Sequence, residues 1–174
     1  MVQVNFGNFK EYDVNNRFFN PNLADGALLD IGVYAVSFAR WFMTSKPNTS
    51  LTTMTPLETG VDESSGILLK NIENEIATIS LTMRAKQPKR GLVACENGYI
   101  EVYNFPRADK AKITYTKDGH TEEIVCGESR LALNYEIRDM EEYVSSLNGQ
   151  ENLSYVCDVM DVLTEVQRLW GKYE

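Results

Sequence analysis

Three side chains in the first forty residues have the types and the spacing of a site for proton transfer and substrate binding. Asp30 and Tyr34 lie four residues apart, so they share one face if this segment is helical. A carboxylate beside a phenol can relay a proton or orient a substrate hydroxyl. Arg17 lies upstream among aromatic residues, and its planar guanidinium could hold Asp30 or a substrate oxygen. We therefore take Arg17, Asp30 and Tyr34 as candidate substrate-binding residues, and Asp30 and Tyr34 as candidate catalytic residues.

Each of these residues also has a structural interpretation. Asp30 stands in an otherwise apolar run, where a carboxylate is costly unless it is paired or hydrogen-bonded. It could cap or bond a neighbouring loop, Tyr34 could be a core residue with a satisfied hydroxyl, and Arg17 could be an ordinary surface arginine. Gly32 costs about 1 kcal/mol in a helix interior relative to alanine, which indicates close packing against the backbone. The spacing alone favours the structural interpretation and leaves both open.

The sequence lacks the residues that metal sites, hydrolase triads and nucleotide-binding loops require. His120 is the single histidine and follows Asp118-Gly119 at an expected hairpin tip, so we expect it to be solvated. A lone histidine argues against a zinc site or a serine-hydrolase triad, and we predict no metal site. The glycines form neither G-x-G-x-x-G nor a phosphate-binding P-loop. We therefore predict no cofactor-binding residues in this chain and no cofactor for the chain alone.

Composition and charge exclude several partners. The chain has 174 residues, 43% of them hydrophobic and 24% charged, which is typical of a globular domain. Its net charge is −8, and all of the excess lies in residues 121–174. Because an acidic chain is repelled by phosphate backbones and anionic lipids, we expect neither nucleic acid nor membrane as a partner. The longest apolar stretch, Ala27–Met43, is interrupted by polar residues and is too short for a membrane span.

The three cysteines carry a compartment prediction. They are odd in number and lack metal-ligand spacing, so we interpret them as reduced thiols of a cytoplasmic protein. Cys126 and Cys157 fall in apolar patterns, so we expect them in the core.

The pattern along the chain predicts an α+β fold. Residues 1–9 and several central segments alternate apolar and polar residues, as strands do. Asn97-Gly98 and Asp118-Gly119 separate such runs and favour type I′ hairpin turns, and a longer turn is expected at Asn71–Asn74. Successive hairpins imply an open, mainly antiparallel β-sheet, with helices packed on one face.

Three helices are expected around this sheet. Asp25 could cap a buried helix from Gly26 to about Thr44. Near the end, apolar residues recur at helical spacing from Ile137 to Leu147, with Gly149 as a stop, and Ser154 could cap the last helix.

The segment from Arg17 to Tyr34 reads R-F-F-N-P-N-L-A-D-G-A-L-L-D-I-G-V-Y. It resembles the signature that opens the C-terminal domain of the Gfo/Idh/MocA oxidoreductases: an Arg–aromatic–Pro loop, a glycine-rich step, then L-x-D-x-G-x-[HY]. The opening strand, M-V-Q-V-N-F-G, is similar to the strand that leaves the family's nucleotide-binding domain. The segment N-Y-E-I-R-D-M-E-E-Y-V resembles the family's late helix and Val156–Leu169 its last helix, so nearly the whole chain is covered in the right order. The step Ala24-Asp25-Gly26 has fewer glycines than the family often has.

This resemblance implies a role for the chain and for its residues. Family members join an N-terminal Rossmann domain that binds NAD or NADP to a C-terminal domain whose open sheet commonly forms the oligomer interface. Asp30 matches the substrate-orienting aspartate, and Tyr34 matches the proton-transfer position. The catalytic lysine of the family's Glu-Lys-Pro motif is missing, because Ser45-Lys46-Pro47 lacks the glutamate and follows the helix.

We therefore expect residues 1–174 to be a single C-terminal substrate-binding and oligomerisation domain, with the Rossmann domain absent from this chain. It would belong to an NAD(P)-dependent oxidoreductase acting on a sugar, polyol or related hydroxy compound, would be inactive alone, and would form a homo-oligomer through the open sheet face. The alternative is a non-enzymatic β-sheet interaction module of the same fold. A third possibility, a self-sufficient hydrolase, is disfavoured because the sequence lacks the nucleophile–base pair that such an enzyme needs.

Overall fold

The protein is described by a computed structural model that covers residues 1–23, 26–146 and 150–172. Within these ranges the strands are β1 (Val2–Gly7), β2 (Thr49–Pro56), β3 (Asp62–Lys70), β4 (Ile76–Thr82), β5 (Gln87–Cys95), β6 (Gly98–Tyr103), β7 (Lys110–Tyr115) and β8 (Thr121–Val125). The α-helices are α1 (Val33–Trp41), α2 (Ala132–Ser146) and α3 (Gln150–Leu169). A π-helical segment, Leu28–Gly32, leads directly into α1, and a short 3-10 turn, Ser129–Leu131, leads into α2.

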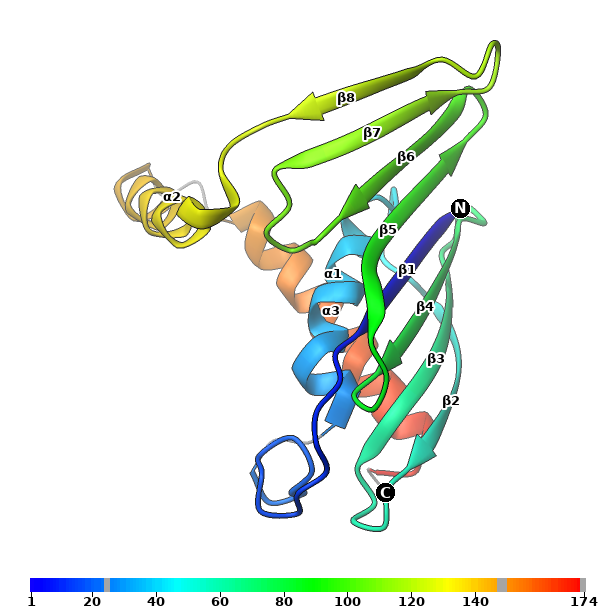
Figure 1. Cartoon of the computed structure of the whole chain (residues 1–174), viewed down its shortest axis with the longest axis vertical. Coiled ribbons are helices and arrows are strands. Elements are labelled where there is room, and N and C mark those ends of the chain that lie inside the picture. The colour runs from blue at the N-terminus through cyan, green and yellow to red at the C-terminus, as the bar shows by residue number, and fades with distance from the viewer. Residues whose placement is uncertain (24–25, 147–149, 173–174) are drawn as a thin grey trace.

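The strands form one open sheet in the order β2-β3-β4-β1-β5-β6-β7-β8 (Figure 1). Every neighbouring pair is antiparallel except β1 and β4, which run parallel because the chain passes through α1, β2 and β3 between them. The predicted α+β class, with an open and mainly antiparallel sheet, is confirmed. The parallel pair is the one departure from a chain of hairpins.

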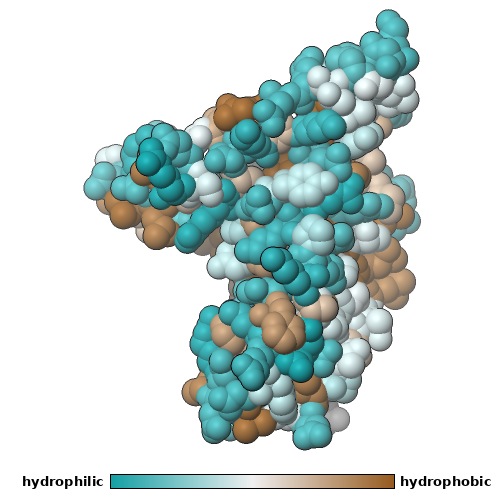
Figure 2. Space-filling model, in the orientation of Figure 1, coloured by the Kyte–Doolittle hydropathy of each residue, from teal (hydrophilic) through white to brown (hydrophobic). Residues whose placement is uncertain are grey.

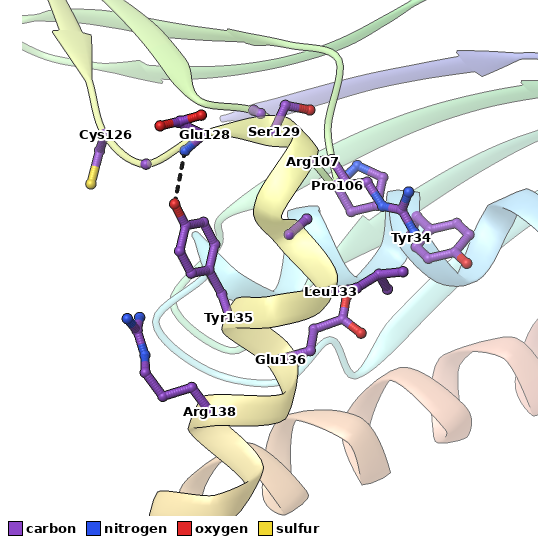
Figure 3. A pocket seen from close by; sticks show the side chains of 13 residues that line it. Tyr34, Pro106, Arg107, Cys126, Glu128, Ser129, Leu133, Tyr135, Glu136 and Arg138 are labelled. Carbon is purple, nitrogen blue, oxygen red and sulfur yellow. Dashed lines mark hydrogen bonds between the residues drawn. The ribbon is translucent and has the colours of Figure 1, made fainter.

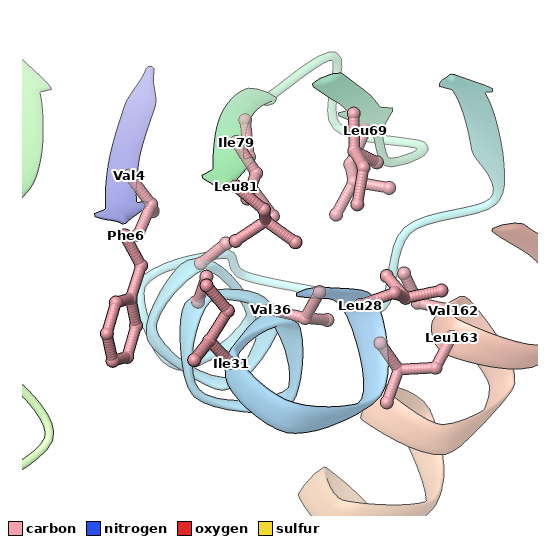
Figure 4. Packing of buried hydrophobic residues seen from close by; sticks show 14 of the residues in the cluster. Val4, Phe6, Leu28, Ile31, Val36, Leu69, Ile79, Leu81, Val162 and Leu163 are labelled. Atoms are coloured by element: carbon pink, nitrogen blue, oxygen red, sulfur yellow. The ribbon is translucent and has the colours of Figure 1, made fainter. Parts of the chain in front are cut away.

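The core lies between the helices and one half of the sheet. Alternate residues of β1, β3 and β4 point toward α1 and α3, as the period of a strand requires. Figure 4 shows Val4, Ile79 and Leu69 from the strands above Val36 of α1 and Leu163 of α3. Arg40 ties the two helices together: its Nε donates to Asp158 at 2.8 Å, and its guanidinium lies over the Tyr155 ring at 4.4 Å.

The hairpins are present where they were predicted, but their turn types differ. Gly98 begins β6 without a positive φ, and a Cβ there would come within 2.3 Å of the Thr114 carbonyl oxygen of β7. Glycine is therefore required at this position by the close approach of the next strand, and the type I′ prediction for Asn97-Gly98 is wrong. At the second hairpin only Gly119 has a positive φ, of 72°, so Asp118-Gly119 is not a type I′ turn either. The turn at Asn71–Asn74 is confirmed, with Asn74 at φ 64°.

The helix α2 differs from the other two because none of its described side chains is buried. It projects beyond the layer formed by α1 and α3 (Figure 1), and hydrophobic side chains gather along it on the surface (Figure 2). Its exposed apolar residues, defined here as the α2 face, are Leu133, Ile137, Met140 and Val144. The helical spacing of this segment is thus confirmed, whereas its proposed end at Leu147 and Gly149 lies outside the described residues.

Two further expectations about the end of the chain are wrong. Ser154 lies inside α3, which already begins at Gln150, so it does not cap this helix. Cys126 and Cys157 are exposed free thiols, as is Cys95. Their apolar neighbours Val125 and Val156 are exposed as well, so the apolar pattern marks surface and not core. In the described part of the chain, no helix is long and apolar enough to cross a bilayer.

Candidate functional site

The helix that carries Asp30 and Tyr34 begins with an irregular turn. Asp30 lies in the π-helical segment, and such segments occur frequently at functional sites. A Cβ on Gly32 would come within 2.9 Å of the Leu81 side chain of β4, so the predicted close packing is observed. The helix ends at Trp41, short of Thr44, and is only partly buried, since Tyr34 and Trp41 expose 44% and 62% of their surface. The proposed cap, Asp25, lies outside the described residues.

Arg17 and Asp30 form an ion pair. The Nη2 atom of Arg17 lies 3.0 Å from Oδ1 of Asp30, and the side chains expose 58% and 19% of their surface. The Phe18 ring supports this arrangement, because the guanidinium of Arg17 lies 4.2 Å from its centroid and Nζ of Lys10 lies 4.3 Å away. The carboxylate in the apolar helix is therefore paired, as its burial requires.

Tyr34 lies at the edge of an aromatic group. Its ring lies 6.3 Å from Phe6 of β1, which meets Phe105 edge-on at 5.7 Å. Phe105 is buried and precedes Pro106 through a cis peptide bond in the loop between β6 and β7. Nζ of Lys89 lies over the Phe6 ring at 4.7 Å, which adds a cation to this group. The Tyr34 ring is thus held by packing on one side and is open on the other.

The open side of Tyr34 faces a cavity of about 710 Å³, which we call the Tyr34 cavity. This volume is within the range of about 300–1,000 Å³ that is usual for ligand pockets. Its walls come from three parts of the chain: Tyr34 of α1, the loop 106–108, and the segment from Cys126 to Arg138 that leads into α2. A second, more apolar cavity of about 400 Å³ shares Tyr34 and Pro106 with it and reaches Phe38 and Trp41.

The start of α2 divides the lining of the Tyr34 cavity (Figure 3). Arg107, Leu133 and Glu136 lie on the side of α2 that faces Tyr34, whereas Tyr135 and Arg138 lie on its other side. The Tyr135 hydroxyl accepts a hydrogen bond from the Glu128 backbone N–H at 3.1 Å. A ligand that reaches Tyr34 would therefore meet Arg107 and Glu136 first.

The structure brings the predicted site residues together only in part. Arg17 pairs with Asp30, and Tyr34 follows one helical turn later, but neither Arg17 nor Asp30 lines the Tyr34 cavity. Arg107 and Glu136 were not predicted, because they come from a loop and a helix more than 70 positions beyond Tyr34. The Phe-Pro step before Arg107 is the one local signal of an unusual loop there.

The chemistry available at this site is proton transfer and polar binding. No cluster of three metal-ligating side chains occurs among the residues that the structure describes. His120 is exposed beside Asp118, as predicted, far along the chain from the site. The described walls contain two phenols, two arginines and two glutamates, which suit hydroxyl groups of a ligand.

The sequence is similar to those of known oxidoreductases over about half of its length. Residues 1–101 match the family described as GFO/IDH/MocA C-terminal domain. The chain is 34% identical over 87 residues to trans-1,2-dihydrobenzene-1,2-diol dehydrogenase of Danio rerio, which is 49% of this chain and 26% of that protein. It is 28% identical over 103 residues to D-xylose 1-dehydrogenase (NADP(+)) 2 of Haloferax volcanii, which is 58% of this chain and 32% of that protein.

Solved structures share the fold over almost the whole chain. The 3-ketoreductase KijD10 from Actinomadura kijaniata, in complex with NADP and TDP-benzene, superposes with a TM-score of 0.80 at 18% identity, covering 96% of this chain and 52% of that one. The aldose-aldose oxidoreductase from Caulobacter crescentus gives 0.75 at 16% identity, with the same coverage. The chain therefore spans about half the length of these solved proteins and matches an even smaller part of the curated relatives.

Proposed function

The chain belongs to the GFO/IDH/MocA C-terminal domain family, and from this membership we propose that it is the substrate-binding and oligomerisation domain of an NAD(P)-dependent oxidoreductase. Its substrate is a sugar, a polyol or a related hydroxy compound. A dinucleotide-binding domain outside residues 1–174 completes the enzyme, so this chain is inactive alone. The free thiols support a cytoplasmic location.

The observation that carries this proposal is Tyr34 on the wall of a ligand-sized cavity, one helical turn after a paired carboxylate. Proteins named as dehydrogenases of diols and of xylose are its sequence relatives, which supports a hydroxyl-bearing substrate. Oxidation of a hydroxyl removes a hydride from carbon and a proton from oxygen. NAD or NADP, when bound, exchanges the hydride.

The residues of this chain handle the proton and the position of the substrate. During reduction the Tyr34 hydroxyl donates its proton to the substrate oxygen, and during oxidation the Tyr34 phenolate takes that proton back and becomes the hydroxyl again. The Asp30 carboxylate, one helical turn before Tyr34, orients the substrate. Arg17 holds this carboxylate in place through an ion pair of 3.0 Å. Packing against Phe6 keeps the tyrosine ring in one orientation.

The cofactor belongs mainly to the missing domain. The chain offers no glycine-rich phosphate cradle, whereas the aromatic surface beside Tyr34, formed by Phe38, Trp41 and Phe42, suits the apolar part of a bound ring system. The α2 face, with Ile137 and Val144 exposed by 61% and 70%, is the surface that the dinucleotide-binding domain covers. The Tyr34 cavity then lies at a domain boundary, where ligand sites are common.

The uncovered face of the sheet supports the proposed homo-oligomer. The residues of β2, β3, β4 and β6 that point away from the helices are largely Ser, Thr and Tyr, with Leu51 and Leu68 among them. Arg90 and Glu101 form a salt bridge of 2.8 Å on this face. A partly polar, partly apolar face of this kind suits a two-fold, sheet-to-sheet dimer.

Exchange of Asp30 for asparagine tests the proposal in the full-length enzyme. Asp30→Asn keeps the shape of the side chain and removes its charge, so turnover should fall by about tenfold or more if the carboxylate orients the site. Asp118→Asn, at the exposed β7–β8 hairpin, is the matched control and should leave turnover unchanged. Normal turnover of the folded Asp30→Asn enzyme, with a loss of stability alone, would support a purely structural role of Asp30, whereas a full-length wild-type protein without any turnover would support the non-enzymatic alternative.

A further inference from the structure

Arg107 is an arginine without a partner at the mouth of the Tyr34 cavity. Its side chain is exposed, and no carboxylate or carbonyl among the described residues pairs with it. The loop that carries it is anchored by Phe105, which is buried against Phe6 and Phe38 at ring distances of 5.7 and 5.2 Å. The guanidinium is thus supplied from a fixed backbone and remains available to a ligand.

Glu136 has the complementary position on α2. It lines the same cavity, lies on the side of α2 that faces Tyr34 (Figure 3), and has no hydrogen-bond or ion-pair partner in the described parts of the chain. Arg107 and Glu136 do not pair with each other, although both face the cavity. Two opposite charges that share a cavity without contact leave space for a ligand between them.

The other charges of the cavity are already engaged. Glu128 lies 2.5 Å from Nε of Arg130, and Arg138 stacks over the Tyr135 ring at 5.3 Å on the other side of α2. Only Arg107 and Glu136 of the described lining therefore offer free charge next to Tyr34, and these two charges balance.

We propose that Arg107 and Glu136 contact the substrate and select a neutral polyhydroxy compound over its acidic or basic counterparts. A hydroxyl group both donates and accepts, so vicinal hydroxyls can accept from the guanidinium and donate to the carboxylate at once. A carboxylate or phosphate on the substrate would pair with Arg107 but lie against Glu136, and an ammonium group would have the opposite conflict. This inference rests on the proposed function, because it concerns the substrate of the same site.

The α2 face makes this selection stronger. Glu136 borders that face, since Ile137 and Met140 lie one and four residues further along the helix. When the dinucleotide-binding domain covers the face, both charges lose water and then require hydrogen-bond partners from the ligand. A neutral sugar supplies these partners without adding charge.

The test measures binding of three matched sugars to the full-length protein by saturation-transfer NMR, which does not depend on turnover. D-glucose, D-glucuronate and D-glucosamine differ in one group and carry no charge, a negative charge and a positive charge. We expect glucose to bind most tightly, and Arg107→Gln and Glu136→Gln each to weaken it by about tenfold to a hundredfold. Arg168→Gln and Glu141→Gln, two exposed positions outside the cavity, should stay within about twofold.

The charge dependence separates substrate contact from a structural role. Glu136→Gln should improve glucuronate relative to glucose, and Arg107→Gln should improve glucosamine relative to glucose. Tighter binding of glucuronate or glucosamine to the wild type, affinities of the two variants equal to the controls, or no binding of any of the three sugars would overturn the inference. A full-length wild-type protein that shows this binding pattern but no oxidoreductase turnover would overturn only the proposed function.

Discussion

The helices α1 and α3 bury their apolar sides against strands β1 to β4, whereas α2 holds its apolar side out to solvent. Leu163 of α3 exposes 2% of its surface, but Ile137 of α2 exposes 61%. Both helices show the same amphipathic spacing in the sequence. The difference is that α3 packs against the rest of the core, whereas nothing in the described chain covers the apolar side of α2.

This contrast separates the half of the domain that forms the buried core from the half whose residues face a ligand or a partner. The packed half contains the largely buried ion pair of Arg40 and Asp158 and the anchored ring of Phe6. The half built from β6, β7, β8 and α2 carries the cavity-lining Arg107 and Glu136 and the exposed α2 face. Tyr34 stands on the border between them, which is where a side chain can be held from one side and meet a ligand on the other.

Truncation of one apolar residue in each half gives the largest expected difference. Leu163→Ala should lower the free energy of unfolding of this chain by about 2–5 kcal/mol, because it leaves a cavity between α3 and the sheet. Ile137→Ala removes a similar volume from an exposed site and should change it by less than about 0.5 kcal/mol. Urea unfolding of the two variants measures both values, and equal losses would mean that α2 is packed in solution.

A charge introduced on each of the two exposed surfaces tests which of them forms the contact between copies of the chain. Leu68→Lys places a charge on the open face of β3 and should shift a sheet-to-sheet dimer toward a 19.7 kDa monomer in light scattering at micromolar concentration. Leu133→Lys, on the α2 face, should leave the assembly intact. A wild-type chain that is monomeric at this concentration would contradict the dimer, and dissociation by Leu133→Lys would assign the assembly to the α2 face.

A small pH effect is expected within the packed half, at Glu75. Burial raises the pKa of its carboxyl, but hydrogen bonds from the Thr44 backbone at 2.7 Å, the Asn71 amide and the Thr44 hydroxyl outweigh burial and hold the pKa below its usual value. A lowered pKa contributes stability that is present above the ordinary carboxyl pKa and is lost as the pH falls through the folded-state value.

The corresponding variant is Glu75→Gln. It should be less stable than the wild type by about 1 kcal/mol at pH 7, and this deficit should shrink as the pH falls below about 4. Glu58→Gln, at an exposed position, is the control and should show no such trend. A deficit that is constant from pH 7 to pH 3 would mean that the charge of Glu75 contributes nothing.

The sequence predicts the sheet well because strand alternation is a local signal, and the periods of β4, β6 and β7 follow it directly. The turn types failed because Gly98 is required by a neighbouring strand, which no local pattern reveals. The prediction that Cys126 and Cys157 are buried failed because an apolar pattern does not show whether another element covers it. Of the candidate site, Asp30 and Tyr34 share a short segment and could be identified, whereas Arg107 and Glu136 meet Tyr34 only through the fold.

Turnover of the full-length enzyme with Tyr34→Phe tests the central claim most directly. The change removes one hydroxyl and almost no volume, and Tyr34 has no hydrogen-bond partner among the described residues, so the thermal midpoint should barely move. If Tyr34 transfers the proton, kcat should fall by a factor of about 10²–10⁴. A kcat equal to that of the wild type would contradict the assignment of Tyr34 as the proton-transfer group.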